Sequence, residues 1–147
     1  MGNYNLIERL LKDFTEINDF VQSFELSFDD QRSKWNENEK LFPTIYGVVR
    51  NIENLEYTIN WNIDIFILDN LTQDRSNEKS IMNTTQEIGN QFINYVRNVE
   101  DKDFSFIVKP RLTPLNNFDN NRMNGWQVNL TLETRREQCY YGDKNND

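Results

Sequence analysis

The alternation of apolar and polar residues is strongest between residues 57 and 69, which read YTINWNIDIFILD. Every second residue from Tyr57 to Ile67 is apolar, so one face of this segment is apolar along its whole length. The opposite face begins with polar side chains and ends with Phe66 and Leu68. The pattern predicts a long strand whose second face is covered by other residues over only part of its length.

Four other segments have the pattern of strands. Residues 125–135, GWQVNLTLETR, alternate as clearly as the long strand, and shorter strands are predicted for residues 24–28, 41–49 and 104–112. The polar, Asn-rich segment between 113 and 124 predicts a loop.

Two segments have apolar residues at spacings of three and four, as expected for amphipathic helices. The first covers residues 3 to about 22. The second begins after the possible N-caps Asp74, Ser76 and Asn77 and runs to about residue 99. Gly89 inside the second helix costs about 1 kcal/mol relative to Ala, which suggests that this helix approaches another element closely.

The predicted order is helix, three strands, helix, two strands. Strands with one apolar face and two helices to cover it predict an α+β fold, a two-layer sandwich. We expect a mainly antiparallel sheet of about four to five strands. Residues 1–132 would form a single domain, and residues 133–147 a polar tail or arm.

Charge and composition exclude several classes of protein. The 147 residues carry a net charge of −8, and basic residues are scattered, so tight binding to nucleic acid is not expected. The chain has no histidine and a single cysteine, Cys139, which excludes Cys-His and Ser-His chemistry within one chain and an intramolecular disulfide. No segment has the apolar length of a membrane span.

The carboxylates near the end of the long strand are the main candidates for chemistry, because Mg²⁺ in nucleases is held by such groups. Asp64 and Asp69 are five residues apart, however, and therefore point to opposite faces of a regular strand. Asp74 and Glu78 follow without a lysine suitably placed on a neighbouring strand. We predict no catalytic, cofactor or metal site, and no enzymatic activity.

The predicted surfaces of the sheet say more about function than the arrangement of reactive residues does. If the long strand and the last strand are neighbours, their polar positions form one hydrogen-bonding face. One interpretation is that this face is exposed to solvent. The other is that it contacts another subunit or lines a channel. This face comprises Asn60, Asn62, Asp64, Gln127, Asn129 and Thr131. Large apolar residues in polar surroundings, or on the second face of the long strand, are candidates for a subunit interface. These are Trp35, Phe66, Leu68, Tyr140 and Tyr141.

The order of elements resembles that of tail-terminator, tail-completion and neck-ring proteins of tailed bacteriophages, most closely those of crAss-like phages. The residues that carry the resemblance are FPTIYGVV (42–49), WNIDIFILDNLTQDRSNEKSIMNTTQEIGNQFI (61–93) and PLNNFDNNRMNGWQVNLTLET (114–134). Three features are similar to the pattern of these proteins. They are an aspartate-capped helix after an apolar strand, Ile88-Gly89 within that helix, and a last strand that begins with Gly125-Trp126.

The resemblance implies a structural virion protein, made in the cytoplasm of a host bacterium, that forms a ring at the head–tail junction. Such a ring, sixfold or twelvefold, joins the portal or connector to the tail or other ring proteins and leaves a channel through which DNA passes without specific binding. Ring closure needs a head-to-tail interface between copies, which would cover Phe66 and Leu68 from outside. An alternative from another class is an acidic cytoplasmic inhibitor or immunity-type binder that mimics DNA.

Overall fold

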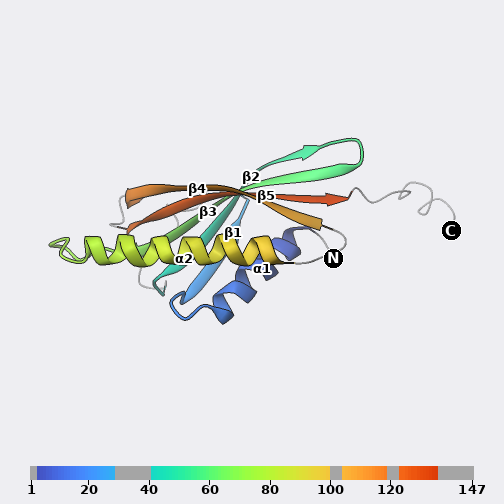
Figure 1. Ribbon diagram of the computed structural model, residues 1–147. Coiled ribbons are helices and arrows are strands. Elements are labelled where there is room, and N and C mark those ends of the chain that lie inside the picture. The colour runs from blue at the N-terminus through green and yellow to red at the C-terminus, as the bar shows by residue number, and fades with distance from the viewer. Residues whose placement is uncertain (1–2, 29–40, 100–103, 119–122, 136–147) are drawn as a thin grey trace.

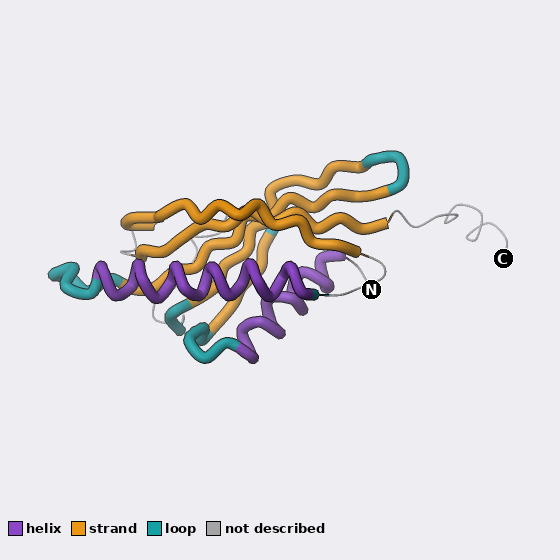
Figure 2. The backbone as a smooth tube through the Cα atoms, viewed as in Figure 1, coloured by secondary structure: helices purple, strands orange, loops and turns teal. Residues whose placement is uncertain are grey.

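The structure is a computed structural model that describes residues 3–28, 41–99, 104–118 and 123–135. Within these ranges, a five-stranded sheet is covered on one face by two helices (Figure 1). The elements are α1 (Asn3–Ile17), β1 (Ser23–Ser27), β2 (Thr44–Asn54), β3 (Thr58–Asn70), α2 (Glu78–Asn98), β4 (Phe104–Phe118) and β5 (Met123–Arg135). The predicted α+β fold with two layers, a sheet and a pair of helices, is confirmed (Figure 2).

The strand order in the sheet is β1-β2-β3-β5-β4, with antiparallel pairing except between β1 and β2. The predicted neighbourhood of β3 and β5 is confirmed over thirteen residue pairs, from Thr58 opposite Arg135 to Asn70 opposite Met123. The parallel pair was not predicted from the sequence. In this pair both strands run in the same direction, from Ser23 opposite Thr44 to Ser27 opposite Val48.

Helix α1 ends at Ile17, five residues earlier than predicted. The side-chain oxygen of Asn18 accepts hydrogen bonds from the backbone nitrogens of Phe20 and Val21, at 2.9 and 3.1 Å. This local turn competes with continuation of the helix, as Asn side chains commonly do. Ile17, an apolar residue within the predicted helix, is consequently the last residue of α1 and is largely exposed.

Strand β4 continues to Phe118 and β5 begins at Met123, so most of the segment predicted as an Asn-rich loop is strand. Pairing explains the difference, because Leu115 lies opposite Gly125 and Phe118 opposite Met123, and backbone hydrogen bonds between strands do not require apolar side chains. Strand β5 also continues to Arg135, and Thr134 is buried. Residues 133–135, which the prediction assigned to the tail, belong to this strand, and the boundary at residue 132 stays a prediction.

The main core lies between the helices and the inner face of the sheet. Buried residues of this core include Ile7, Leu10, Leu11 and Phe14 of α1, Ile88, Phe92, Ile93 and Val96 of α2, and Ile45, Ile63, Ile65, Ile67, Val128, Leu130 and Leu132 of the sheet. Gly89 allows α2 to approach the sheet, as expected, because a Cβ there would lie 3.0 Å from Cδ2 of Leu112 and 3.4 Å from Cδ1 of Ile67.

Candidate partner surface

The outer face of the sheet, opposite the helices, has one apolar part and one polar part. The apolar part, here called the outer cluster, consists of Tyr46, Val48, Phe66, Leu68 and Met123. Phe42 and Leu115 pack against it, from the segment before β2 and from β4. The rings of Tyr46 and Phe66 are stacked, with centroids 6.0 Å apart.

Phe66 and Leu68 are 3% and 0% exposed within the single chain. They offer no surface to a neighbouring subunit, and the prediction that a second copy covers them is corrected. The physical reason is that strand alternation reveals which side chains share a face, whereas the residues that cover that face come from distant segments. The outer cluster is a second small core of the same domain.

The polar part of the outer face is a set of cross-strand hydrogen bonds, here called the polar ladder, with Asn62 and Asp64 of β3 at its centre. Asp64 accepts hydrogen bonds from Nε of Arg50 at 2.6 Å and from Nδ2 of Asn129 at 3.1 Å. Asn62 accepts one from Oγ1 of Thr131 at 3.0 Å. These side chains therefore act as hydrogen-bond partners for one another, and the ladder spans β2, β3 and β5.

A β-bulge in β2 brings the second side of the ladder into position. The pairing shifts between Val49, opposite Ile63, and Asn51, opposite Asn62. Nδ2 of Asn62 consequently reaches Oδ1 of Asn51 at 2.6 Å and Oε1 of Glu53 at 3.1 Å. The extra residue also directs Arg50 toward Asp64, because a bulge re-aims a side chain while the strand continues.

The six residues predicted to share a polar face lie on β3 and β5, which pair as the prediction required. Gln127 lies opposite Phe66 and is half-buried. The Oδ1 atom of Asn60 is buried and has no hydrogen-bond partner in the part of the chain that the structure describes. The face is thus a real structural unit, whose role in a channel or a subunit contact stays a prediction.

Three of the predicted interface residues, Trp35, Tyr140 and Tyr141, lie outside the described residues. So does most of the predicted arm, residues 136–147.

The carboxylates considered for metal binding are dispersed. Asp64 belongs to the polar ladder, and Asp69 accepts a hydrogen bond from the backbone nitrogen of Asn70 at 2.8 Å. Among the described residues, no group of three His, Cys, Asp or Glu side chains is placed to hold a metal ion. Neither helix in the described ranges has the length and apolar character to cross a membrane.

Three titratable groups have shifted pKa values. Burial raises the pKa of the Asp69 carboxyl, and the hydrogen bond from Asn70 opposes this to a smaller extent. Hydrogen bonds, the largest effect being that from the backbone nitrogen of Ser76, lower the pKa of Asp74. Burial, followed by the negative charge of Asp13, raises the pKa of the Tyr95 hydroxyl. These shifts follow from local packing and do not converge on one site.

The end of the β2–β3 hairpin is a structural feature that was not predicted from the sequence. It extends past the C-terminal end of α2 (Figure 1). Its large apolar side chains are exposed, with Ile52 at 42%, Leu55 at 45% and Tyr57 at 70%. We call residues 52–57 the hairpin tip. The signal available in the sequence was the apolar pair Leu55 and Tyr57 within an otherwise polar connection.

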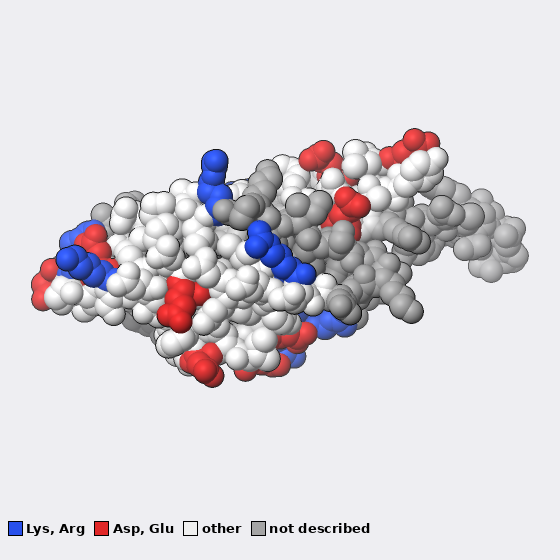
Figure 3. Space-filling view, in the orientation of Figure 1, with Lys and Arg blue, Asp and Glu red and all other residues white. Residues whose placement is uncertain are grey.

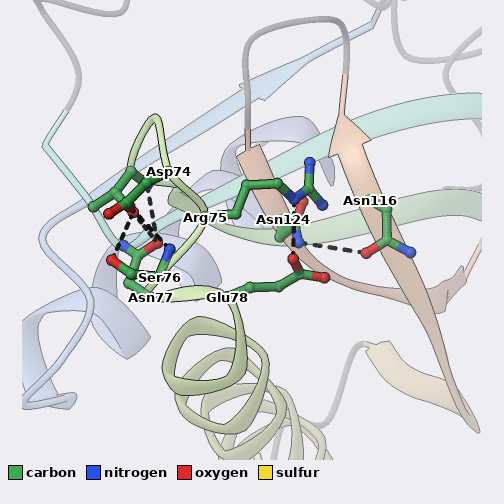
Figure 4. Close-up of polar contacts among 8 residues, drawn as sticks. Asp74, Arg75, Ser76, Asn77, Glu78, Asn116 and Asn124 are labelled. Atoms are coloured by element: carbon green, nitrogen blue, oxygen red, sulfur yellow. Dashed lines mark hydrogen bonds and ion pairs between the residues drawn. The ribbon is translucent and has the colours of Figure 1, made fainter.

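A hollow of about 580 Å³ lies at the opposite end of the molecule, where α2 begins. Its lining residues are Arg75, Ser76, Glu78, Lys79, Met82 and Asn83. The loop beside it is held by Asp74, whose Oδ1 accepts hydrogen bonds from the backbone nitrogen of Ser76 and from the Thr72 hydroxyl (Figure 4). Nε of Arg75, a residue with a positive φ of 59°, donates to Glu78 at 3.0 Å. We call this region the α2 hollow.

Asn77, one of the three predicted N-cap positions, is the N-cap residue of α2. Its side chain, however, forms hydrogen bonds within the preceding loop rather than with the helix. Its Oδ1 accepts hydrogen bonds from the backbone nitrogen and the hydroxyl of Thr72, at 2.9 and 3.1 Å, and it makes no side-chain capping bond to the helix. Its Nδ2 donates a hydrogen bond to the backbone carbonyl oxygen of Asn70, the last residue of β3, at 3.1 Å. The loop that forms part of the wall of the α2 hollow is therefore attached to the end of β3.

Comparison of the chain with protein-family models and with curated proteins finds no match.

Proposed function

We propose that this chain is a structural virion protein that assembles as a ring at the head–tail junction of a tailed phage. The observation that carries the proposal is the hairpin tip, which presents Ile52, Leu55 and Tyr57 on a projection that its own helices do not cover. Exposed apolar side chains grouped on a projection favour contact with another protein. The resemblance in the order of elements directs the proposal to phage ring proteins.

The polar ladder is compatible with a surface past which DNA slides. Its two acidic members have partners within the ladder, since Asp64 is paired with Arg50 and Glu53 accepts a hydrogen bond from Asn62. The Thr131 hydroxyl likewise donates to Asn62. The net charge of −8 also works against tight binding to DNA, because that binding is driven by the release of counterions when basic groups neutralise phosphates. We place this face toward the channel, with portal, connector or tail proteins above and below the ring.

The proposal assigns no catalytic role to the chain. Under it, the protein acts through its surfaces, is located in the virion, and needs no cofactor. The negative net charge is also consistent with the alternative, an inhibitor or immunity-type protein that mimics DNA. In that case the polar ladder would be a binding surface.

Mass spectrometry of purified phage particles tests the proposal directly. The chain should be recovered together with portal and tail proteins, in a copy number that is a multiple of six. Its absence from particles would remove the structural role. Tight one-to-one binding to a DNA-processing enzyme would then favour the inhibitor, and Mg²⁺-dependent cleavage of DNA would favour a nuclease.

A further inference from the structure

We infer that the hairpin tip of one copy docks in the α2 hollow of the next copy, as a head-to-tail contact. This inference rests on the proposed function and names the surfaces through which the ring would form. It follows from two features of one chain that complement each other and lie at opposite ends, so that they cannot meet within a single molecule (Figure 1).

The first step is the match of size, together with one apolar contact that the wall of the hollow can offer. Tyr57 is the most exposed of the large apolar side chains in the described chain, at 70%, and Leu55 stands near it at the turn. The α2 hollow has a volume within the range of about 300 to 1,000 Å³ that accommodates groups much larger than one aromatic ring. Met82 in its wall provides a flexible thioether, which packs favourably against an aromatic ring.

The second step is charge. Glu53 and Glu56 give the hairpin tip an acidic character, because residues 52–57 contain no Lys or Arg. Acidic side chains are visible at the upper right of the space-filling view (Figure 3). The α2 hollow contains Lys79, which is exposed and has no acidic partner among the described residues, and the Arg75–Glu78 ion pair. Glu56 facing Lys79 across the contact would favour the correct orientation of the two copies.

The third step compares the α2 hollow with a second hollow in the described part of the chain. That hollow, of about 300 Å³, is lined by Phe14, Ile17, Asn18, Asp19, Phe20, Gln91, Asn94, Tyr95 and Asn98. Its one charged residue is Asp19, which would repel the acidic hairpin tip. The α2 hollow is also nearly twice as large, and it is therefore the better receptor.

The fourth step is symmetry. A contact between two different surfaces of the same chain is heterologous, and repetition of it produces a ring when the rotation per copy closes. Two identical hairpin tips facing each other would instead bring Glu56 against Glu56. Charge therefore disfavours the isologous dimer and favours the head-to-tail arrangement.

Charge reversal tests the contact. We expect the full-length chain to self-associate in sedimentation velocity, and Glu56→Lys or Lys79→Glu to weaken association by about tenfold, because each places like charges across the contact. An equimolar mixture of the two variants should associate again, since the reversed tip of one meets the reversed hollow of the other. Glu87→Lys, the same charge change on the exposed side of α2, serves as the control and should associate as the original chain does.

A crosslink extends the test to weak association. With Cys139→Ser as background, the pair Glu56→Cys and Lys79→Cys should form disulfide-linked oligomers at high concentration, whereas Glu56→Cys with Glu87→Cys should not. The inference is overturned if the chain neither self-associates nor crosslinks, or if the mixed charge variants associate no better than each does alone. Recovery of the chain from phage particles in either case would leave the proposed function standing with a different interface.

Discussion

The indole nitrogen of Trp126 donates a hydrogen bond to the backbone carbonyl oxygen of Met82, 2.9 Å away. Trp126 lies near the start of β5 and Met82 in the second turn of α2, 44 residues apart in the chain. The bond fixes the beginning of α2 on the sheet, and Met82 is also part of the wall of the α2 hollow.

Trp126→Phe removes this hydrogen bond and should lower the free energy of unfolding by about 1 kcal/mol, measured by urea denaturation. Trp61→Phe is the matched control, because Nε1 of Trp61 is buried and has no hydrogen-bond partner in the described chain. Replacing Trp61 should therefore lose packing but no hydrogen bond. An equal or larger loss for Trp61→Phe would show that the bond to Met82 contributes nothing measurable.

Gly125→Ala should prevent normal folding or destabilise the protein by more than about 3 kcal/mol. A Cβ at this position would overlap the carbonyl oxygen of Ile67, a backbone atom of the paired strand that cannot move independently. Gly89→Ala is the comparison, because its Cβ would meet the end of a Leu112 side chain and the helix gains about 1 kcal/mol in propensity. Thermal unfolding of both variants should separate them clearly, and similar melting temperatures would contradict the geometry.

Phe66→Asp should unfold the domain, because it buries an unpaired carboxylate in the outer cluster. The loss should be at least the roughly 3–5 kcal/mol typical of Phe→Ala in a core. Tyr57→Asp, at an exposed position, should leave the circular dichroism spectrum and the melting temperature nearly unchanged. If the Phe66→Asp variant folds normally but does not assemble, Phe66 belongs to a subunit interface and not to a core of the domain.

Asp69→Asn should stabilise the protein at neutral pH. Burial raises the folded-state pKa of Asp69, so the folded protein binds a proton more tightly than the unfolded chain does. The stability that depends on this proton is present below the unfolded pKa and is lost as the pH rises through the folded pKa. The advantage of the Asp69→Asn variant over the original chain in urea denaturation should consequently grow from about pH 3 to pH 7, and a constant difference would rule out this explanation.

Local patterns in the sequence predicted the elements and their faces, and hence the fold class. The alternation in β3 and β5 placed Asn62 and Thr131 on one face correctly, because successive side chains of a strand point to opposite sides whatever their neighbours are. In α2 the apolar residues at spacings of three and four, such as Ile88 and Phe92, likewise lie on its buried side.

Tertiary structure decided what covers each face and where the elements end. Phe66 has the same local pattern whether a second copy or its own chain covers it, and only the arrival of Phe42 and Leu115 from distant segments distinguishes the two. The Asn-rich end of β4 is a strand because β5 pairs with it, and local propensity is too weak to determine such pairing. The separation of the hairpin tip from the α2 hollow likewise depends on contacts between segments far apart in the chain, which a local pattern does not contain.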